Sequence, residues 1–387
     1  MHICFVAGAF PRGKEAVYTF VKGYVDAIAD LGIKCSVIAP QSVTKVLVGH
    51  AKMRPGHWHY LTAKGSRVDV WQPRYISLSR HFAKSRMRRL IKAVQRGVRA
   101  LDRPVDLFYA HFWEMGIVTA QIAGDTPVFV TCGEGVGGKL KQLGQLFEPS
   151  VIERSREKIA GVVYVSSRNV ENAKTFGLQK DTPYIVAPNG YHPSKFYRKD
   201  QAAVREKLGF AQDAFIVAFT GSFIPRKGTL RLSEALKTLH AKYHGEEKIY
   251  SLFIGSGKEQ PDCEHILFCG TLSNEEVSDY LNAADIFVLP TKDEGCCNAI
   301  VEALACGLPV VSSAKEFNDD ILDENCSLRI DESSIQEIAG AIDKLYQDPA
   351  LVERLSAGAL EKAETLTIQE RVGRIVAFLE ETTGLKA

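Results

Sequence analysis

Short apolar segments alternate with helix-like segments along almost the whole chain, and this alternation limits the fold more than any other feature. In the first half, strand-like apolar runs occupy residues 3–7, 34–39, 107–110, 128–131 and 162–165. After a break near Pro188 the alternation restarts, with runs at residues 215–220, 250–254, 266–268, 286–289 and 310–312. Strands that alternate with helices form parallel sheets covered by helices. We therefore predict an α/β protein with two Rossmann-like parallel-sheet domains that face each other across a cleft.

Two segments interrupt the alternation. Residues 41–75 are predicted to be a loop because they contain Gly49, Pro55, Gly56, Gly65 and Pro73. A second break, residues 188–200, combines proline and glycine with a polar stretch and is typical of a domain boundary. We therefore place the first domain at residues 1–188 and the second at residues 189–367.

Two carboxylates flank the start of one predicted helix in the second domain. Glu294 follows the apolar strand 286–289, and Glu302 lies inside the helix that ends near Gly307. Ligands of α/β proteins bind at the carboxyl ends of the strands, and the first amides of a helix favour phosphate. Both acids are therefore candidates for gripping ligand hydroxyl groups. The alternative is two glutamates on the protein surface.

Four further candidate residues follow predicted strands. Arg226 and Lys227 lie in the loop after residues 215–220 and could neutralise a diphosphate, although an ordinary surface loop is the alternative. His111 follows strand 107–110 and is a functional candidate, although most single histidines are structural. Gly13 follows the first strand and is a candidate binding residue. The alternative is a glycine that simply forms a tight turn.

The spacing Glu-x7-Glu ahead of the run Ala-Leu-Ala-Cys-Gly-Leu-Pro-Val-Val at residues 303–311 resembles the signature of retaining glycosyltransferases of the large bacterial family four, which have the GT-B fold. Residues 188–190 resemble the Pro-Asn-Gly segment of that family, residues 220–228 its diphosphate-binding loop, and residues 268–272 the strand end beside its nucleotide base. The resemblance covers nearly the whole chain and is most specific over residues 185–312.

This resemblance implies roles for the candidate residues. Arg226 and Lys227 would act on the diphosphate leaving group, Glu294 on hydroxyls of the transferred sugar, and Glu302 on the ribose, with His111 near the sugar. The remaining substrate-binding residues that it implies are Gly13, Gly221, Gly270, Leu272, Gly295, Cys297 and Asn298. It also implies that a last helix, within residues 368–387, crosses back to the first domain.

The chain departs from the family pattern at two positions. Ser222 stands where the family often has arginine directly after the first glycine of the loop, so Arg226 is a candidate substitute for that cation. Cys132 stands where a histidine is common, and we assign it no role.

Neither a metal nor a cofactor is expected. No Asp-x-Asp motif occurs, so nothing points to the metal-clamped diphosphate of GT-A enzymes. His57 and His59 lack supporting acids, and we interpret their segment as a flexible loop. Residues 133–138 satisfy G-x-G-x-x-G, but no strong helix pattern follows them, which disfavours a dinucleotide site.

Charge is distributed unevenly although the net charge is only +2. Residues 1–190 contain 27 Lys and Arg against 14 Asp and Glu, and the remainder of the chain is acidic. Much of the excess lies in residues 74–103, where apolar residues interleave with helical spacing. Such a helix is suited to an anionic membrane or a polyanionic acceptor. The alternative is a solvated helix that packs its apolar stripe on its own domain. Nucleic acid is not expected, because no recognition motif accompanies the charge.

The remaining composition fits a cytoplasmic protein. The chain has nine cysteines without a Cys-x-x-Cys pair, no signal-peptide pattern at its start and no apolar run of membrane-spanning length. We therefore expect a location in the cytoplasm, with the inner face of the membrane as a further possibility.

The combined expectation is a metal-independent, retaining glycosyltransferase. It would move a sugar from a nucleotide-diphosphate donor, such as a UDP-sugar, to a saccharide or lipid-linked saccharide acceptor in surface polysaccharide synthesis. Two alternatives remain at this point. One is a GT-B sugar-nucleotide epimerase, and the other is a non-catalytic protein that binds membranes or polyanions.

Overall fold

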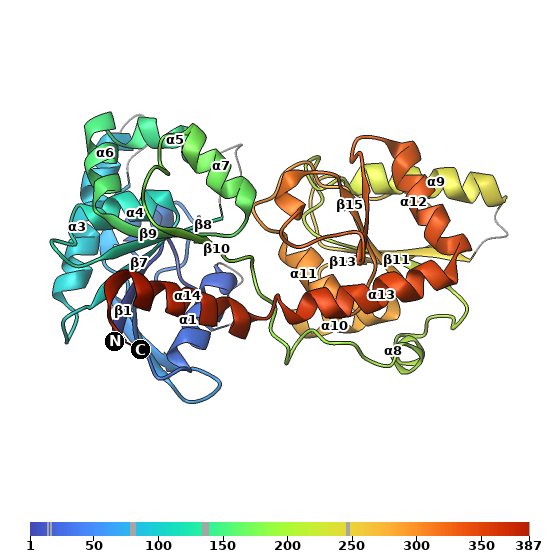
Figure 1. Ribbon diagram of the computed structural model, residues 1–387, viewed down its shortest axis with the longest axis horizontal. Helices are drawn as coiled ribbons and strands as arrows, with labels where there is room; N and C mark the ends of the chain where they lie inside the picture. Colours follow the sequence, from blue (N-terminus) through green and yellow to red (C-terminus); the bar gives the residue numbers. More distant parts are fainter. Residues whose placement is uncertain (14, 16–17, 78–82, 134–138, 245–247, 387) are drawn as a thin grey trace. The chain divides into compact units, whose positions relative to one another are not determined.

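The computed structural model describes residues 1–387 except residues 14, 16–17, 78–82, 134–138, 245–247 and 387. The chain divides into two compact units (Figure 1). The first contains Met1–Ala187 and Arg371–Ala387, and the second contains Pro188–Glu370. Each unit is built on a sheet of mainly parallel strands, which confirms the predicted α/β fold class.

The first unit has an eight-stranded sheet in the order β10-β9-β8-β7-β1-β2-β5-β4. Its strands are β1 (His2–Val6), β2 (Lys34–Ile38), β4 (His57–Leu61), β5 (Arg67–Trp71), β7 (Leu107–His111), β8 (Val128–Cys132), β9 (Ile159–Tyr164) and β10 (Tyr184–Val186). A short parallel pair, β3 (Gln41–Ser42) and β6 (Arg74–Tyr75), accompanies it. The helices are α1 (Thr19–Ala29), α2 (Val43–Leu47), α3 (Ala83–Arg99), α4 (Trp113–Ala120), α5 (Lys139–Leu146), α6 (Pro149–Glu157) and α7 (Ser167–Thr175).

The loop predicted for residues 41–75 is wrong. This segment contains β3, α2 and β6, and its strands β4 and β5 form an antiparallel hairpin at the edge of the sheet. The exposure of β4 alternates along the strand, since Trp58 and Tyr60 are half-buried and pack near Phe10. His57 and His59 are therefore exposed strand residues and not part of a flexible loop. The glycines and prolines, which flank these short strands, hid a period-two pattern.

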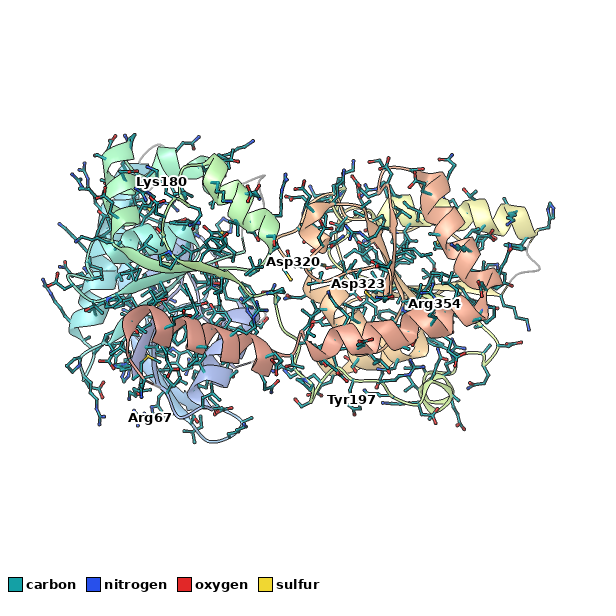
Figure 2. The ribbon with its side chains drawn as sticks, viewed as in Figure 1. Arg67, Lys180, Tyr197, Asp320, Asp323 and Arg354 are labelled. Atoms are coloured by element: carbon teal, nitrogen blue, oxygen red, sulfur yellow. The ribbon has the colours of Figure 1, made fainter. Side chains whose placement is uncertain are left out.

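The basic helix α3 packs its apolar stripe on its own unit. Met87, Leu90, Ala93, Val94 and Gly97 are buried. Five of its cationic side chains are exposed on the opposite side, namely Lys84, Arg88, Lys92, Arg96 and Arg99. The apolar stripe is thus used within the fold, as the alternative interpretation of this helix predicted. Other cations, such as Arg67 and Lys180, also lie on the outside of this unit (Figure 2).

The second unit has a six-stranded parallel sheet in the order β13-β12-β11-β14-β15-β16. Its strands are β11 (Phe215–Thr220), β12 (Ile249–Ile254), β13 (Ile266–Gly270), β14 (Ile286–Leu289), β15 (Val310–Ser313) and β16 (Ser327–Ile330). The helices are α8 (Gln201–Leu208), α9 (Thr229–Tyr243), α10 (Asn274–Ala283), α11 (Asn298–Ala305), α12 (Ile335–Gln347) and α13 (Pro349–Glu364), with a short 3-10 turn η2 (Glu316–Asn318).

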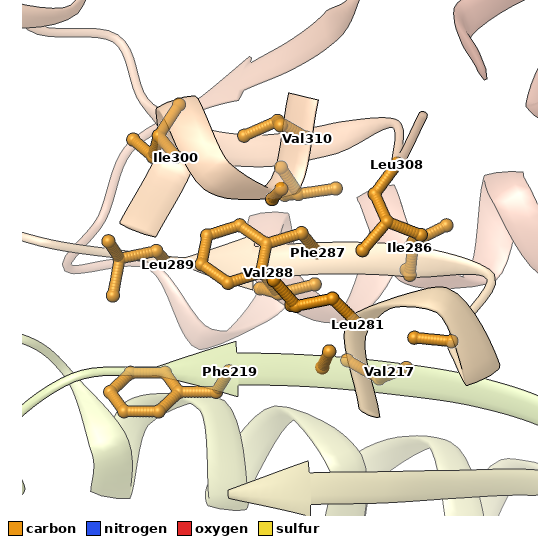
Figure 3. Close-up of a cluster of buried hydrophobic side chains, with 14 of the residues drawn as sticks. Val217, Phe219, Leu281, Ile286, Phe287, Val288, Leu289, Ile300, Leu308 and Val310 are labelled. Carbon is orange, nitrogen blue, oxygen red and sulfur yellow. The ribbon is translucent and has the colours of Figure 1, made fainter. Parts of the chain in front are cut away.

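The core of the second unit lies around its two central strands, β11 and β14. Figure 3 shows Phe219 of β11 beside Phe287 and Leu289 of β14, and all three side chains are fully buried. Ile300 of α11 covers the same cluster. Strands that are buried on both faces read as continuous apolar runs, which is why the sequence pattern located them.

The last helix, α14 (Ile368–Thr383), belongs to the first unit from Arg371 onward. Its Phe378 packs edge-on against Phe129 of β8, with the ring centroids 5.8 Å apart. Gly161 of β9 leaves the space for this contact, because a Cβ at that position would lie 2.7 Å from atoms of both rings. A glycine in the sheet thus lets the end of the chain pack against it.

We expect Gly161→Ala to destabilise the first unit by about 1–3 kcal/mol, the usual cost of inserting a methyl group into a packed core. The matched control is Gly373→Ala in α14, where a Cβ would have nothing within 4 Å and alanine should add about 0.5–1 kcal/mol. All three tryptophans, Trp58, Trp71 and Trp113, belong to this unit, so urea unfolding followed by fluorescence measures it directly. An unchanged midpoint for Gly161→Ala would contradict the packing argument.

Candidate active site

The carboxyl ends of four neighbouring parallel strands meet at one edge of the second sheet. The strands are β13, β12, β11 and β14. The Gly221 amide donates to the Ile254 carbonyl at 2.9 Å, and the Gly255 amide donates to the Gly270 carbonyl at 2.7 Å. A Cβ on Gly255 would lie only 1.8 Å from the Gly221 carbonyl oxygen. The three loops therefore pack backbone against backbone, which brings the predicted residues Gly221 and Gly270 to the same edge.

Glu294 lies at this edge between two cations. Its Oε1 atom is 2.6 Å from Lys227 Nζ and 2.9 Å from Arg226 Nη1. The Thr291 hydroxyl donates to the same oxygen at 2.7 Å. The loop after β11 and the loop after β14 are also joined through their backbones, because the Lys292 amide donates to the Arg226 carbonyl at 2.8 Å. Three residues predicted separately thus form one ion-paired cluster, which the sequence did not indicate.

The charge states of the cluster follow from these contacts. Burial raises the pKa of Glu294, but Lys227 and Arg226 outweigh it, so its pKa lies below the ordinary value. Burial lowers the pKa of Lys227, but Cys297 and Glu294 outweigh it and carry the pKa above the ordinary value. At neutral pH the cluster therefore has two positive charges and one negative charge. A net positive group at a strand edge is suited to a phosphate ligand.

The start of α11 is held in place by a residue that sequence reasoning missed. The side-chain amide of Asn189 donates to the Cys296 carbonyl at 3.1 Å and to the side chain of Asn298 at 2.8 Å. The cap of the helix is Cys297, which is buried and lies 3.8 Å from the Lys227 ammonium through its sulfur atom. Asn189 lies in the Pro-Asn-Gly segment quoted above, so the signal was present in the sequence.

Glu302 occupies the same face of α11 as Asn298, one turn further along. Burial raises the pKa of Glu302 to about 7, although Lys195 acts in the opposite direction. The carboxyl group is therefore close to half-ionised at neutral pH. Unlike Glu294, it can both donate and accept hydrogen bonds under ordinary conditions.

Two hydroxyl groups near the loop after β11 are further candidates for ligand contacts, and the sequence did not indicate them. Thr220 ends β11 and Thr229 begins α9, and the hydroxyl oxygens of both are buried without a hydrogen-bond partner among the described residues. Between them Gly228 has a φ of 83° and caps α9, and a Cβ there would lie 2.6 Å from the Pro290 carbonyl. The loop is therefore tightly packed against the segment after β14.

Gly295 lies in the loop between Glu294 and α11, and Leu272 follows β13, where it is half-buried against the core. The geometry thus brings most of the predicted second-domain residues to one edge of the sheet.

A cavity of about 500 Å³ lies elsewhere in this unit, beside Arg198, Asp285 and Leu308. Because Asp285 and Leu308 precede β14 and β15, that cavity is at the opposite edge.

In the first unit, His111 is the last residue of β7 and is buried. Its Nδ1 atom is 2.7 Å from the hydroxyl oxygen of Tyr24, whose pKa is raised well above its ordinary value by burial. Phe112 follows with a φ of 71°, a conformation that a non-glycine residue adopts only under constraint. The imidazole is thus held from both sides, by a neutral phenol and by a strained turn.

Other predicted features of the first unit are less informative. Gly13 has a φ of 60°, which fits a turn, and a Cβ there would have nothing within 4 Å. The motif at residues 133–138 lies almost wholly outside the described residues.

Among the described residues, no group of three or more His, Cys, Asp or Glu side chains could hold a metal ion. Within the same set, no helix has both the length and the apolarity needed to cross a bilayer.

Comparison with known proteins places these features in a family. Residues 200–362, all in the second unit, match the family described as glycosyl transferases group 1. Over 362 residues, or 89% of each chain, the sequence is 26% identical to a Bacillus subtilis (strain 168) protein named as a candidate teichuronic acid biosynthesis glycosyltransferase, TuaC.

Two solved structures show the same fold at low sequence identity. Sucrose-phosphate synthase from Thermosynechococcus elongatus has a TM-score of 0.77 and 16% identity, over 99% of this chain and 100% of that chain. Anabaena Alr3699/HepE in complex with UDP-glucose has a TM-score of 0.71 and 16% identity, over 98% and 100%. The second unit is therefore a group 1 glycosyltransferase domain, and the chain as a whole has the predicted GT-B fold.

Proposed function

We propose that the second unit binds a nucleotide-diphosphate sugar, with UDP as the first candidate nucleotide, and that the chain transfers its sugar without a metal ion. The observation that carries this proposal is the cluster of Lys227, Arg226 and Glu294 at the carboxyl edge of the sheet. UDP is favoured because the Anabaena structure, which shares the fold, was solved with UDP-glucose.

The residues of the cluster have complementary tasks in this proposal. Lys227 and Arg226 neutralise the diphosphate, and Glu294 accepts hydrogen bonds from hydroxyls of the transferred sugar. Glu302 does the same for the ribose. The backbone of Gly221, Gly270 and Leu272 borders the nucleotide, and the loop from Gly295 to Asn298 presents its amides to the phosphates.

The reaction breaks the bond between the anomeric carbon and the diphosphate and forms a bond from that carbon to an acceptor hydroxyl. In the front-face mechanism that the family implies, the departing phosphate oxygen takes the proton of the acceptor. Negative charge grows on the diphosphate as its bond to the sugar breaks. Cations already held in place by Glu294 stabilise that charge without reorganising, which is often the largest catalytic contribution.

The first unit binds the acceptor in this proposal, and His111 and Gly13 have the roles toward the donor sugar that the family resemblance implies. The acceptor is a saccharide or a lipid-linked saccharide of a surface polysaccharide. The relative named for teichuronic acid biosynthesis supports this class. We place the enzyme in the cytoplasm, at the inner face of the membrane when the acceptor is lipid-linked. The exposed cations of α3 would then contact anionic lipids.

The proposed donor site is tested by thermal unfolding with UDP, GDP, ADP and their sugar conjugates, without metal. Binding to the native state raises stability by mass action, by about 2.7 kcal/mol at a ligand concentration of 100 times Kd. We expect a rise with one nucleotide, and with UDP first. No rise with any of them, for folded protein, would contradict the donor-site assignment.

Lys227→Ala should lower kcat about a hundredfold to a thousandfold, the usual effect of removing one group that stabilises the transition state. It should also weaken UDP binding, because a partly buried cation is lost. Lys292→Ala is the matched control, since Lys292 is an exposed lysine of the neighbouring loop. Sugar transfer and UDP affinity are measured on both variants, and equal rates would count against the proposal.

Glu294→Gln should have the opposite effect on binding. The carboxylate neutralises part of the charge on Lys227 and Arg226, so its removal should tighten UDP binding while kcat falls, because the sugar loses its partner. Calorimetric titration with UDP and a transfer assay separate the two effects. Weaker UDP binding in Glu294→Gln would show that the carboxylate serves mainly to hold the cations in position.

Glu302 should make donor binding depend on pH. Its pKa of about 7 means that the carboxyl is protonated in acid and ionised in base. A ribose hydroxyl donates best to the ionised form, so affinity for UDP-glucose should rise by up to about tenfold from about pH 6 to about pH 8. Glu302→Gln should show a flat profile. An equal slope in both proteins would assign the pH dependence to another group.

A further inference from the structure

A pocket of about 440 Å³ lies in the first unit at the carboxyl ends of β1, β2 and β5. Gly8 follows β1, Ala39 follows β2, and Gln72 follows β5, and all three line the pocket. These strands are neighbours and parallel, so the pocket has the position in its sheet that ligand sites occupy in α/β folds. None of the residues predicted from the sequence as binding residues lines it.

The pocket contains an excess of positive charge. Lys45, Lys52 and Arg54 line it, with Glu15 as the one carboxylate among its lining residues. Glu15 is paired with Arg54, whose Nη2 atom lies 2.6 Å from its Oε2 atom. Within the described part of the chain, no acid forms an ion pair with Lys45 or Lys52. After the Arg54–Glu15 pair is set aside, two lysines give the pocket its charge, and His50 stands beside them.

The cations are attached to a framework that buried amides hold in place. Gln41 is only 7% exposed, and it donates to the Lys52 carbonyl at 3.0 Å and accepts from the Arg54 amide at 3.3 Å. Arg54 also donates to the Phe10 carbonyl at 3.2 Å. Gln72 is 1% exposed and accepts from the Trp58 indole at 3.1 Å. The backbone that carries Lys52 and Arg54 is therefore fixed, and the Arg54 guanidinium with it, while the side chains of Lys45 and Lys52 are exposed.

Large apolar side chains are exposed beside the pocket. Leu47 and Val48 follow Lys45, Met53 lies between Lys52 and Arg54, and Ile76 follows Tyr75 of the lining, with exposed fractions from 48% to 79%. The two segments that carry them are joined, because the Ser77 amide donates to the Thr44 hydroxyl at 3.1 Å. The segments that line the cationic pocket thus also carry exposed apolar side chains, a combination that suits an amphiphilic ligand.

We propose that this pocket binds an anionic group of the acceptor, a phosphate or a carboxylate. The proposal rests on the proposed function only in assigning the acceptor to the first unit. Lys45 and Lys52 would contact the anion directly, and Arg54 would be shared between the anion and Glu15. A neutral acceptor would leave this charge unused. The substrate class is therefore an acidic or phosphate-bearing saccharide.

The test measures amine labelling of individual lysines by mass spectrometry, at matched ionic strength, with sodium chloride as the reference. The probes are inorganic phosphate, glucuronate and a short-chain alkyl phosphate. At ten times Kd, a bound anion should slow labelling of Lys45 and Lys52 about tenfold. Lys64, an exposed lysine in the β4–β5 turn that does not line the pocket, should be unaffected. Equal labelling with chloride and with every probe, or equal protection of Lys64, would overturn the proposal.

The three probes distinguish the sources of the anionic group. Protection by alkyl phosphate at lower concentration than inorganic phosphate would assign the group to a lipid-linked phosphate, because only that probe has an alkyl chain that can contact the exposed apolar side chains. Protection by glucuronate at lower concentration than inorganic phosphate would assign it to an acidic sugar. The labelling assay needs neither donor nor turnover, so its result can be interpreted even if the donor-site assignment fails. The donor-binding measurements can likewise be interpreted if this proposal fails.

Two variants give changes of opposite sign. Lys52→Gln should weaken anion binding about twofold to fivefold, the range for a partly exposed charge pair. Glu15→Gln should tighten it, because Arg54 loses its competing carboxylate while the amide still accepts a hydrogen bond. If the anion were attracted only non-specifically to a basic surface, the changes in affinity in both variants would be small, and Glu15 would have no particular influence. Unchanged affinity in Glu15→Gln would therefore contradict a specific anion site.

Discussion

The charge arrangement at the candidate site depends on one carboxylate oxygen that bridges two cations. Glu294 Oε1 contacts both Lys227 and Arg226, and it does so across two loops that come from neighbouring strands. Without the carboxylate, the two cations would share this partly buried position uncompensated, and an uncompensated charge there is costly. The bridge therefore lets two cations lie together at the strand edge, the position that the proposed function gives to the diphosphate of the donor.

The bridge exists only because the surrounding loops approach each other without side chains between them. Gly255 meets the Gly221 carbonyl, and Gly228 packs beneath the Pro290 carbonyl in a left-handed conformation that other residues avoid. Asn189 then ties the loop before α11 to the start of the unit. Positions that look like flexible glycine-rich segments in the sequence are thus close-packed contacts, and the geometry of the charged residues follows from them.

Sequence reasoning located most strands that read as continuous apolar runs, including the partly exposed β13, and missed the hairpin of β4 and β5. Strands such as β14 read as continuous apolar runs and were predicted within a residue or two of their bounds. The hairpin of β4 and β5 was missed, because β4 is half-exposed and its aromatic residues alternate with polar ones. The segment around Lys45 and Arg54 was treated as loop for the same reason, and its pocket could not be anticipated. Pairing among Glu294, Arg226 and Lys227 was also beyond the sequence, since residues 67 positions apart meet only through the sheet order.

The two charged sites share one physical design, which bears on turnover. In each unit a carboxylate pairs with an arginine at the carboxyl edge of the sheet, Glu294 with Arg226 and Glu15 with Arg54. Cations alone would bind a diphosphate or a phosphate strongly in every state, and uniform binding of substrate and product does not accelerate a reaction. A carboxylate in the proposed donor site reduces that ground-state attraction, while the cations that it holds in place still stabilise the negative charge that grows as the bond breaks. On this view the acids are as important for releasing products as the bases are for binding them.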